Sequence, residues 1–162
     1  MGFLLIVGQA PNKEIWKRAT ARGRRGAERR SARLALSGRC GRKLAELLGV
    51  ELEVFLARTR RVNLNDRWHG KDGKGDAFDE VAGVKKAQAI WRSRGGPKRV
   101  VLLGHVVAEC FGMVGDFLEV HWTFDDRRWL IFPHPSGVNR WWNDPKNRRR
   151  ARAALRQFAG EL

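Results

Sequence analysis

Residues 3–8 read Phe-Leu-Leu-Ile-Val-Gly, five apolar side chains in a row closed by a glycine. A short apolar run without alternation is typical of a strand that is buried on both faces, as in a parallel sheet. Gly8 and Pro11 then interrupt the pattern, so residues 8–12 are expected to form a loop at the carboxyl end of that strand. Residues 99–103 repeat this arrangement ahead of Gly104.

Helical and strand patterns alternate along the rest of the chain. Further strands are expected over residues 59–64, 118–124 and 129–132, the last two joined by a turn at Asp125-Asp126. Helices are expected over residues 39–48, 77–92, 106–111 and 145–158, with Ser37, Asp76 and Asp144 placed to cap three of them. This alternation predicts an α/β fold: a three-layer α/β/α sandwich around a mostly parallel sheet of four to five strands.

The charge of the chain points to a polyanionic partner. The 162 residues contain 33 Lys and Arg against 17 Asp and Glu, a formal net charge of +16. Such an excess destabilises a compact state by self-repulsion, and it suits phosphate-backbone binding. We read residues 1–162 as a single domain with an Arg-rich segment at about 17–33, a poor helix that would order only on a partner. Its candidate phosphate contacts are Arg24, Arg25, Arg29 and Arg30.

Composition excludes several classes of protein. An apolar fraction of 43% argues against wholesale disorder. No apolar run reaches the roughly 18 residues that a membrane span requires, so no membrane partner is expected. Two cysteines, Cys40 and Cys110, make neither a disulfide framework nor a four-cysteine metal site, and we expect a reduced, cytoplasmic, monomeric protein.

Two loops at strand ends carry the candidate chemistry. The first is residues 8–12, and the second is residues 133–142, directly after the last strand. In the second loop two prolines flank His134 and would fix it at the mouth of a site. The same loop is expected to place Val138, Arg140, Trp141 and Trp142 on a protruding tip, and the alternative for the two tryptophans is that they cover the core beneath the final helix. A rigid loop with a histidine and an apolar wedge, in a very basic protein, is what extrusion of a base from DNA would need.

Five segments, in order over about residues 3–158, carry a family resemblance. They are G-x-x-P at residues 8–11, G-R-x-G-x-x-L at 38–44, Val-Asn-Leu at 62–64, Val-Leu-Leu-Gly at 101–104 and H-P-S at 134–136. Together they resemble the uracil-DNA glycosylase superfamily. The resemblance implies that fold and a monofunctional DNA glycosylase, which flips a base out of duplex or single-stranded DNA and hydrolyses its N-glycosidic bond without cofactor or metal.

The resemblance also implies roles for individual residues. His134 would donate a hydrogen bond to the base oxygen, and Asn63 would read the polar edge of the base, with Asn65 as the alternative one side-chain repeat away. The loop after His134 would enter the minor groove with Val138 as its wedge. The DNA-binding residues in that loop would be Ser136, Gly137, Val138, Asn139, Arg140 and Trp141.

The sequence departs from the family pattern at two places. Many members carry a carboxylate or Asn in the first loop, where Gln9 and Ala10 stand here. Gln9 or Asn12 would then only orient water, and the carboxylate would come from Asp66 or Asp76. Leu36 stands at the position of the stacking aromatic, which favours a base other than plain uracil, such as a deaminated purine or a modified pyrimidine. The cysteine count excludes the iron–sulfur cluster of the thermostable branch.

Two other functions remain open from the sequence. Because Gln9 and Ala10 cannot take a proton from water, the chain could be a catalytically inert DNA-binding member of the same fold. The Arg-rich segment over residues 18–33 would instead suit an RNA-binding accessory protein.

Overall fold

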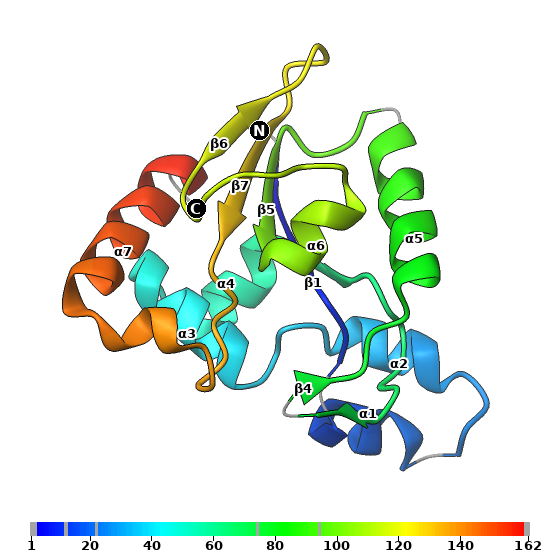
Figure 1. The fold of residues 1–162 in the computed structure, drawn as a ribbon. Coiled ribbons are helices and arrows are strands. Elements are labelled where there is room, and N and C mark those ends of the chain that lie inside the picture. The colour runs from blue at the N-terminus through cyan, green and yellow to red at the C-terminus, as the bar shows by residue number, and fades with distance from the viewer. Residues whose placement is uncertain (1–2, 12, 22, 74, 94, 161–162) are drawn as a thin grey trace.

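The computed structural model describes residues 3–11, 13–21, 23–73, 75–93 and 95–160. Its main sheet has five strands in the order β2-β1-β5-β7-β6, shown in Figure 1. These are β1 (Leu4–Gly8), β2 (Thr59–Asn63), β5 (Arg99–Leu103), β7 (Arg128–Phe132) and β6 (Val120–Trp122). The first four are mutually parallel and β6 runs antiparallel to β7. The predicted α/β class with a mostly parallel sheet is confirmed.

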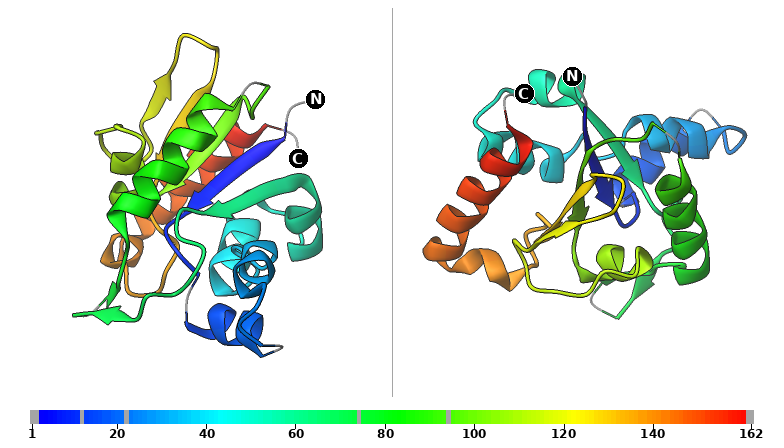
Figure 2. Two further views of the ribbon diagram at one scale, coloured as in Figure 1. Left: turned by 90° about the vertical axis from the view of Figure 1, so that its right-hand side faces the viewer. Right: turned by 90° about the horizontal axis from the view of Figure 1, so that it is seen from above.

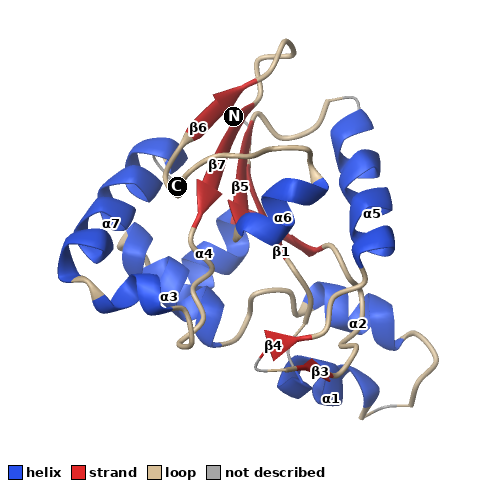
Figure 3. Ribbon diagram, viewed as in Figure 1, coloured by secondary structure: helices blue, strands red, loops and turns tan. Residues whose placement is uncertain are grey.

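Alternate residues of the apolar strands face two separate groups of helices. Leu4 and Ile6 pack with α3 (Arg39–Leu48), α4 (Leu52–Arg58) and α7 (Pro145–Ala159). Leu5 and Val7 face the other side, toward α5 (Glu80–Arg92) and α6 (His105–Cys110). Figures 2 and 3 show the sheet between these two helical layers. The three central strands, β1, β5 and β7, are buried on both faces, which is why their sequences show no polar alternation, whereas the outer strands β2 and β6 are partly exposed.

Two of the three predicted N-caps are wrong. The helix predicted from residue 77 begins at Glu80, and its cap is Asp79, whose carboxylate accepts a hydrogen bond from the Ala82 N–H at 2.9 Å. Asp76 instead belongs to a small hairpin of β3 (Lys71–Asp72) and β4 (Gly75–Asp76). Both carboxylates precede the helical pattern, so local sequence does not choose between them.

Of the other two predicted caps, Ser37 is wrong and Asp144 is confirmed. Gly38 occupies the cap of α3 without a side-chain hydrogen bond. Ser37, predicted for that role, donates its hydroxyl proton to the Leu34 carbonyl oxygen at 2.8 Å. Asp144 caps α7 as predicted, accepting from the Lys146 N–H at 2.7 Å.

The Arg-rich segment is helical, contrary to the prediction of a poor helix. It forms α1 (Lys13–Thr20) and α2 (Ala27–Arg33). The guanidinium of Arg30 donates to the carbonyl oxygens of Ala19 at 2.6 Å, Arg25 at 3.0 Å and Gly23. A cationic side chain thus satisfies backbone carbonyls at the end of α1 and in the following loop, which offsets the glycines that weaken helix formation there.

The topology places a crevice at the carboxyl ends of the parallel strands. From β1 the chain proceeds to β2 on one side, and from β5 it proceeds to β7 on the other. In open α/β sheets, ligands bind where connections leave in opposite directions. No helix within the described residues is long and apolar enough to cross a lipid bilayer.

Candidate active site

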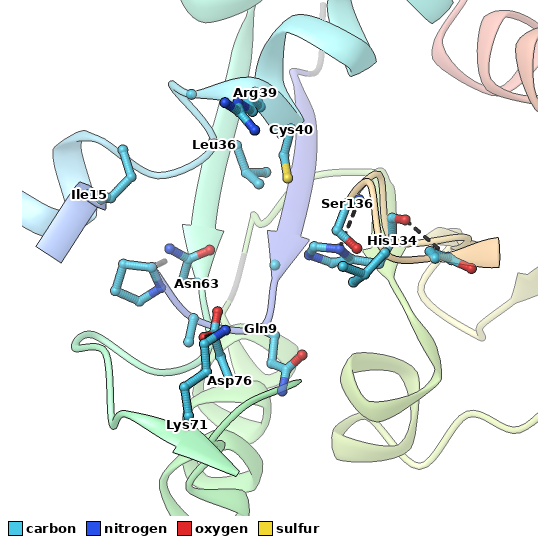
Figure 4. Close-up of a pocket in the computed structure, with 16 residues that line it drawn as sticks. Gln9, Ile15, Leu36, Arg39, Cys40, Asn63, Lys71, Asp76, His134 and Ser136 are labelled. Atoms are coloured by element: carbon cyan, nitrogen blue, oxygen red, sulfur yellow. Dashed lines mark hydrogen bonds and ion pairs between the residues drawn. The ribbon is translucent and has the colours of Figure 1, made fainter. Parts of the chain in front are cut away.

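A cavity of about 640 Å³ opens at the carboxyl ends of β1, β2 and β7. The loop after β1 and the loop after β7 both line it, although they are more than a hundred residues apart in the sequence. Figure 4 shows how its side chains converge. The cavity is lined by Gly8, Gln9, Ala10, Pro11, Ile15, Leu36, Gly38, Arg39, Cys40, Asn63, Lys71, Asp76, His134, Ser136, Val138 and Asn139.

His134 projects into the cavity from the loop after β7 (Figure 4). Its Nδ1 atom accepts a hydrogen bond from the Ser136 N–H at 3.2 Å. The proton of the neutral imidazole therefore resides on Nε2, which makes that atom a donor. Burial lowers the pKa of His134 below its ordinary value, and the Lys43 cation lowers it further, while Asp76 acts in the opposite direction. The imidazole is thus neutral at pH 7.

The backbone of His134 is held from the far side of its loop. Its carbonyl oxygen accepts from the Trp142 indole N–H at 2.8 Å and from the Asn139 side-chain amide at 3.1 Å. Trp142 is buried against Phe132 of β7, and Lys43 lies 4.0 Å above its ring. Trp142 is therefore a positioning residue for the histidine.

Asn63 ends β2 and presents an unpaired acceptor. Its side chain is only 5% exposed, and its Oδ1 atom is buried without a hydrogen-bond partner among the described residues. The same oxygen lies so close to Gly8 that a Cβ atom there would be 2.6 Å from it. A buried acceptor without a donor costs about 1–3 kcal/mol. Asn63 therefore lines the cavity with an oxygen that requires an N–H group.

Asn65, the alternative for base reading, serves the scaffold instead. Its Oδ1 accepts from the Asp79 N–H at 2.7 Å, and its Nδ2 donates to the Asp79 carbonyl oxygen at 3.0 Å. Asn65 thereby fixes the residue that caps α5 and does not line the cavity. The structure thus favours Asn63 over Asn65 as the cavity-lining asparagine.

Asp76 brings a carboxylate into the cavity. Burial alone would raise its pKa, but hydrogen bonds from Lys71 and Trp68, with the Lys71 charge, lower it below the ordinary value. Lys71 Nζ lies 2.8 Å and Trp68 Nε1 3.1 Å from the Asp76 Oδ1. The carboxylate is therefore ionised at neutral pH. Asp66, the other predicted carboxylate, pairs with Lys86 of α5 and does not line the cavity.

The first loop supplies Gln9, Ala10 and Pro11 to the cavity wall. It extends the pairing of β1 with the chain after β2, because the Gly8 and Gln9 carbonyl oxygens each accept a backbone hydrogen bond at 2.9 Å from Leu64 and Asn65. Gln9 carries an amide, which can orient water but cannot take its proton. Asn12, the other predicted water ligand, lies outside the described residues.

Leu36 lines the cavity in a left-handed backbone conformation, with φ of 53°. Its carbonyl oxygen approaches the first turn of α3, where a Cβ atom on Gly41 would lie 1.7 Å from it. The second glycine of the G-R-x-G element is therefore required by this close approach. Cys40 also lines the cavity, and burial raises the pKa of its thiol, so the sulfur is protonated.

The predicted protruding tip is smaller than the sequence indicated. Ser136, Val138 and Asn139 line the cavity, and Val138 is 84% exposed. Gly137 and Arg140 are also exposed. The two tryptophans turn inward: Trp142 is buried, and the half-buried Trp141 packs edge-on against Phe117 at 5.8 Å. Their large apolar area finds partners in the core, which leaves Val138 as the exposed apolar side chain of this loop.

Three of the four arginines predicted to contact phosphate are exposed, and the fourth is engaged within the protein. Arg24, Arg25 and Arg29 are exposed. Arg30 uses three of its nitrogen atoms on backbone carbonyls, so its main role is to hold α1 and α2 together.

Lys71 and Trp68 are site residues that the sequence analysis did not identify. Both act through the β3–β4 hairpin, which brings Lys71 opposite Asp76. The Asp72-Gly73 pair is a turn signal that could have predicted this hairpin and with it the pairing. The hydrogen bond from Trp68 has no signal in the sequence.

The assembled site combines a neutral imidazole donor, an unpaired amide acceptor and an ionised carboxylate around one cavity. Within the described ranges, no group of three or more His, Cys, Asp or Glu residues is arranged to hold a metal ion. No protein-family model matches the chain, and no curated protein shows significant similarity to it. Fold and site geometry are therefore the grounds on which a function can be argued.

Proposed function

We propose that this protein is a monofunctional DNA glycosylase, which draws an extruded base into the cavity and hydrolyses its N-glycosidic bond. The observation that carries the proposal is the pair formed by His134 and Asn63. Both residues line the same cavity: His134 carries a neutral N–H donor, and the buried Asn63 oxygen has no donor among the described residues. Such a pair is complementary to a base edge that offers a carbonyl oxygen beside an N–H group.

This complementarity narrows the class of base. Uracil, hypoxanthine and xanthine all present a carbonyl oxygen next to a ring N–H, because deamination replaces an exocyclic amino group by oxygen. The pyrimidine N3 of cytosine and the N1 of adenine carry no proton and would leave the Asn63 oxygen unpaired. Leu36 offers an aliphatic wall without the geometry of a stacked ring. Guanine and thymine present the same edge, so the pair selects against cytosine and adenine and not against every normal base. Among damaged bases it favours deaminated ones, including the larger purines.

The cavity residues can divide the chemistry of hydrolysis. The C1′–N bond breaks with its electron pair on the base, and the Nε2–H of His134 stabilises the charge that develops on the base oxygen. Positive charge develops on the sugar, and the ionised carboxylate of Asp76 lies in the same cavity to stabilise it and to take the proton of the attacking water. The water oxygen bonds to C1′, and its proton balances the one that the free base gains.

The surface around the cavity suits a nucleic-acid backbone. The exposed arginines Arg24, Arg25 and Arg29 lie on the α1–α2 side, and Arg148, Arg149 and Arg150 are exposed in α7. Val138 stands beside the cavity mouth as an apolar wedge, 84% exposed. In such an arrangement, the contacts between the cations and the phosphates offset the free energy that the wedge spends on unstacking a base.

The deciding experiment is a single-turnover assay on a panel of duplex and single-stranded oligonucleotides. Each carries one uracil, hypoxanthine, xanthine or oxidised base, and abasic sites are revealed by alkaline cleavage. We expect release of at least one deaminated base, and His134→Ala should slow it by about 10²- to 10³-fold. His69→Ala is the matched control, since that exposed histidine lines no described cavity. Equal rates in the two variants would remove His134 from the mechanism.

The second candidate is an inert DNA-binding protein. It is favoured by the first loop, in which neither Gln9 nor Ala10 can accept a proton from water. It is also favoured by the contacts of Asp76, because Lys71 and Trp68 already bind the carboxylate that would have to take that proton. If no oligonucleotide in the panel is cleaved while salt-dependent affinity for DNA persists, this function replaces the first. Preference for structured RNA over every DNA would favour an RNA-binding protein instead.

A further inference from the structure

A second cavity, of about 540 Å³, lies between α1, α2 and the segment before β3. Two tryptophans and three arginines line it. Trp16 comes from α1, Arg29 from α2, and Trp68 follows Arg67 in the segment after β2. The complete lining is Trp16, Thr20, Arg24, Gly26, Ala27, Glu28, Arg29, Arg67 and Trp68.

The charge around this cavity is strongly cationic and largely uncompensated. Arg24, Arg29 and Arg67 are exposed, and none of them forms an ion pair with a carboxylate in the part of the chain that the structure describes. Glu28 is the one carboxylate among the described lining residues. Three guanidinium groups beside one carboxylate leave a local excess suited to phosphate, which arginine recognises through paired N–H donors.

The two tryptophans provide an apolar surface beside the arginines. Trp16 and Trp68 are half-buried, so part of each indole remains accessible to a ligand in the cavity. Indole rings stack on nucleobases of any sequence, and arginines beside them hold the connecting backbone. A free inorganic anion would use the arginines but leave both indoles without a function. A nucleotide uses both.

We propose that this second cavity binds one unpaired nucleotide of the nucleic-acid strand, with its base against Trp16 and Trp68 and its phosphate on the arginines. The identity of the strand rests on the proposed function, because the first cavity is taken to hold the target base of the same molecule. An unpaired neighbour is available in single strands, loops and fraying ends but not inside an intact duplex. The subsite therefore assigns the protein a preference for single-stranded or locally melted DNA.

Trp68 joins the second cavity directly to the first. Its ring lines the second cavity, while its indole N–H donates to the Asp76 carboxylate of the first at 3.1 Å. One side chain thus forms the wall between a stacking surface and the carboxylate that faces the target sugar. A base stacked on this indole would restrict its motion and keep its hydrogen bond to Asp76 in place.

The subsite is tested by binding, without any need for turnover. The probe is a fluorescein-labelled oligothymidylate of about ten nucleotides, within the range that single-strand binding sites cover, measured by anisotropy. Trp16→Ala and Arg67→Gln should each weaken its binding by at least about fivefold, the loss expected for one stacked base. Trp16→Phe should retain most of the affinity because it keeps an aromatic face. Binding of a blunt, lesion-free duplex should change less than twofold in Trp16→Ala.

A matched control removes the same charge elsewhere. Arg58 is exposed at the end of α4, directly before the amino end of β2, whereas the first cavity lies at the carboxyl end of that strand, and Arg58 lines neither cavity. Arg58→Gln should leave oligothymidylate affinity within twofold of the native value. If Trp16→Ala and Arg67→Gln, verified as folded by circular dichroism, bind oligothymidylate like the native protein, the subsite does not exist. Equal losses in Arg58→Gln and Arg67→Gln would mean diffuse electrostatics only and would also overturn it.

Trp68→Phe separates stacking from the link to Asp76. It keeps an aromatic face but removes the indole donor, so oligothymidylate affinity should stay within about threefold of native. The Asp76 carboxyl should then titrate at higher pH in carbon-detected NMR. Failure of the glycosylase proposal would appear as absent base release with the Trp16 effect intact. Failure of the subsite would appear as normal base release with no Trp16 effect.

Discussion

Replacing Asn63 by leucine should make the protein more stable and less functional at the same time. The Asn63 Oδ1 is buried without a partner among the described residues, and such an acceptor costs about 1–3 kcal/mol. Leucine has the same branching as asparagine but larger terminal groups, so the substitution removes this cost without leaving a cavity, and its second methyl group can extend into the open cavity that Asn63 lines. For a chain of this size, each kcal/mol raises Tm by about 2–4 °C. A gain near 2 kcal/mol therefore predicts a rise of about 4–8 °C.

The assay pairs thermal unfolding with single-turnover base release from the best substrate of the panel. Asn63→Leu should raise Tm while base release falls by at least about tenfold, because the base N–H then lacks its acceptor. Asn65→Leu is the matched control: Asn65 makes two hydrogen bonds to Asp79, so that variant should lower Tm. A lower or unchanged Tm in Asn63→Leu would show that the oxygen is satisfied in solution, and the reasoning about the cavity would be refuted.

Three further outcomes are expected. Burial lowers the pKa of His134 below its ordinary 6.5. The rate of base release and the contribution of His134 to the free energy of unfolding should therefore stay constant from neutral pH down to about 6.5 and fall as the pH passes through the lowered pKa. A loss of rate centred above pH 6.5 would contradict this. Arg30→Gln should lower the free energy of unfolding by about 1.5–3 kcal/mol in denaturant titration, because its hydrogen bonds to backbone carbonyls are lost. Arg25→Gln should change that free energy by less than about 0.5 kcal/mol, but it should reduce the slope of log DNA affinity against log salt concentration by about one. Gly41→Ala should destabilise by about 3 kcal/mol in the same assay, while Gly137→Ala, with open space around it, should be neutral.

The central strands of the main sheet were predictable because they obey one strong rule. Residues 3–8 and 99–103 lie between two helical layers, and their apolar runs, which begin after Arg99 in the second segment, follow from burial on both faces. The Arg-rich segment was misjudged because Gly23 and Gly26 were taken to weaken a helix across it. The structure places both glycines in the turn between α1 and α2, whose own residues are good helix formers, and Arg30 then joins the two helices through a carbonyl eleven residues away.

Site residues next to strands could be predicted from the sequence, whereas those positioned by tertiary contacts could not. His134 and Asn63 were identifiable because each directly follows or ends a recognisable strand. Asp76 was identified as one of two candidate carboxylates, but its neighbours suggested a helix cap, and the hairpin that redirects it depends on pairing with Lys71. The sequence left Trp141 and Trp142 either on the surface or over the core, because local sequence does not reveal Phe117 and Phe132, the aromatic partners against which they pack.

The position of β1 in the middle of the sheet sets the order in which the chain can mature on the ribosome. β1 is synthesised before the other strands of the sheet, yet its neighbour on one edge, β5, does not exist until residue 99 has been added. Until then a fully apolar strand has one edge open, and such an edge is a template for pairing with other chains. A fragment that stops at residue 98 should therefore aggregate during expression.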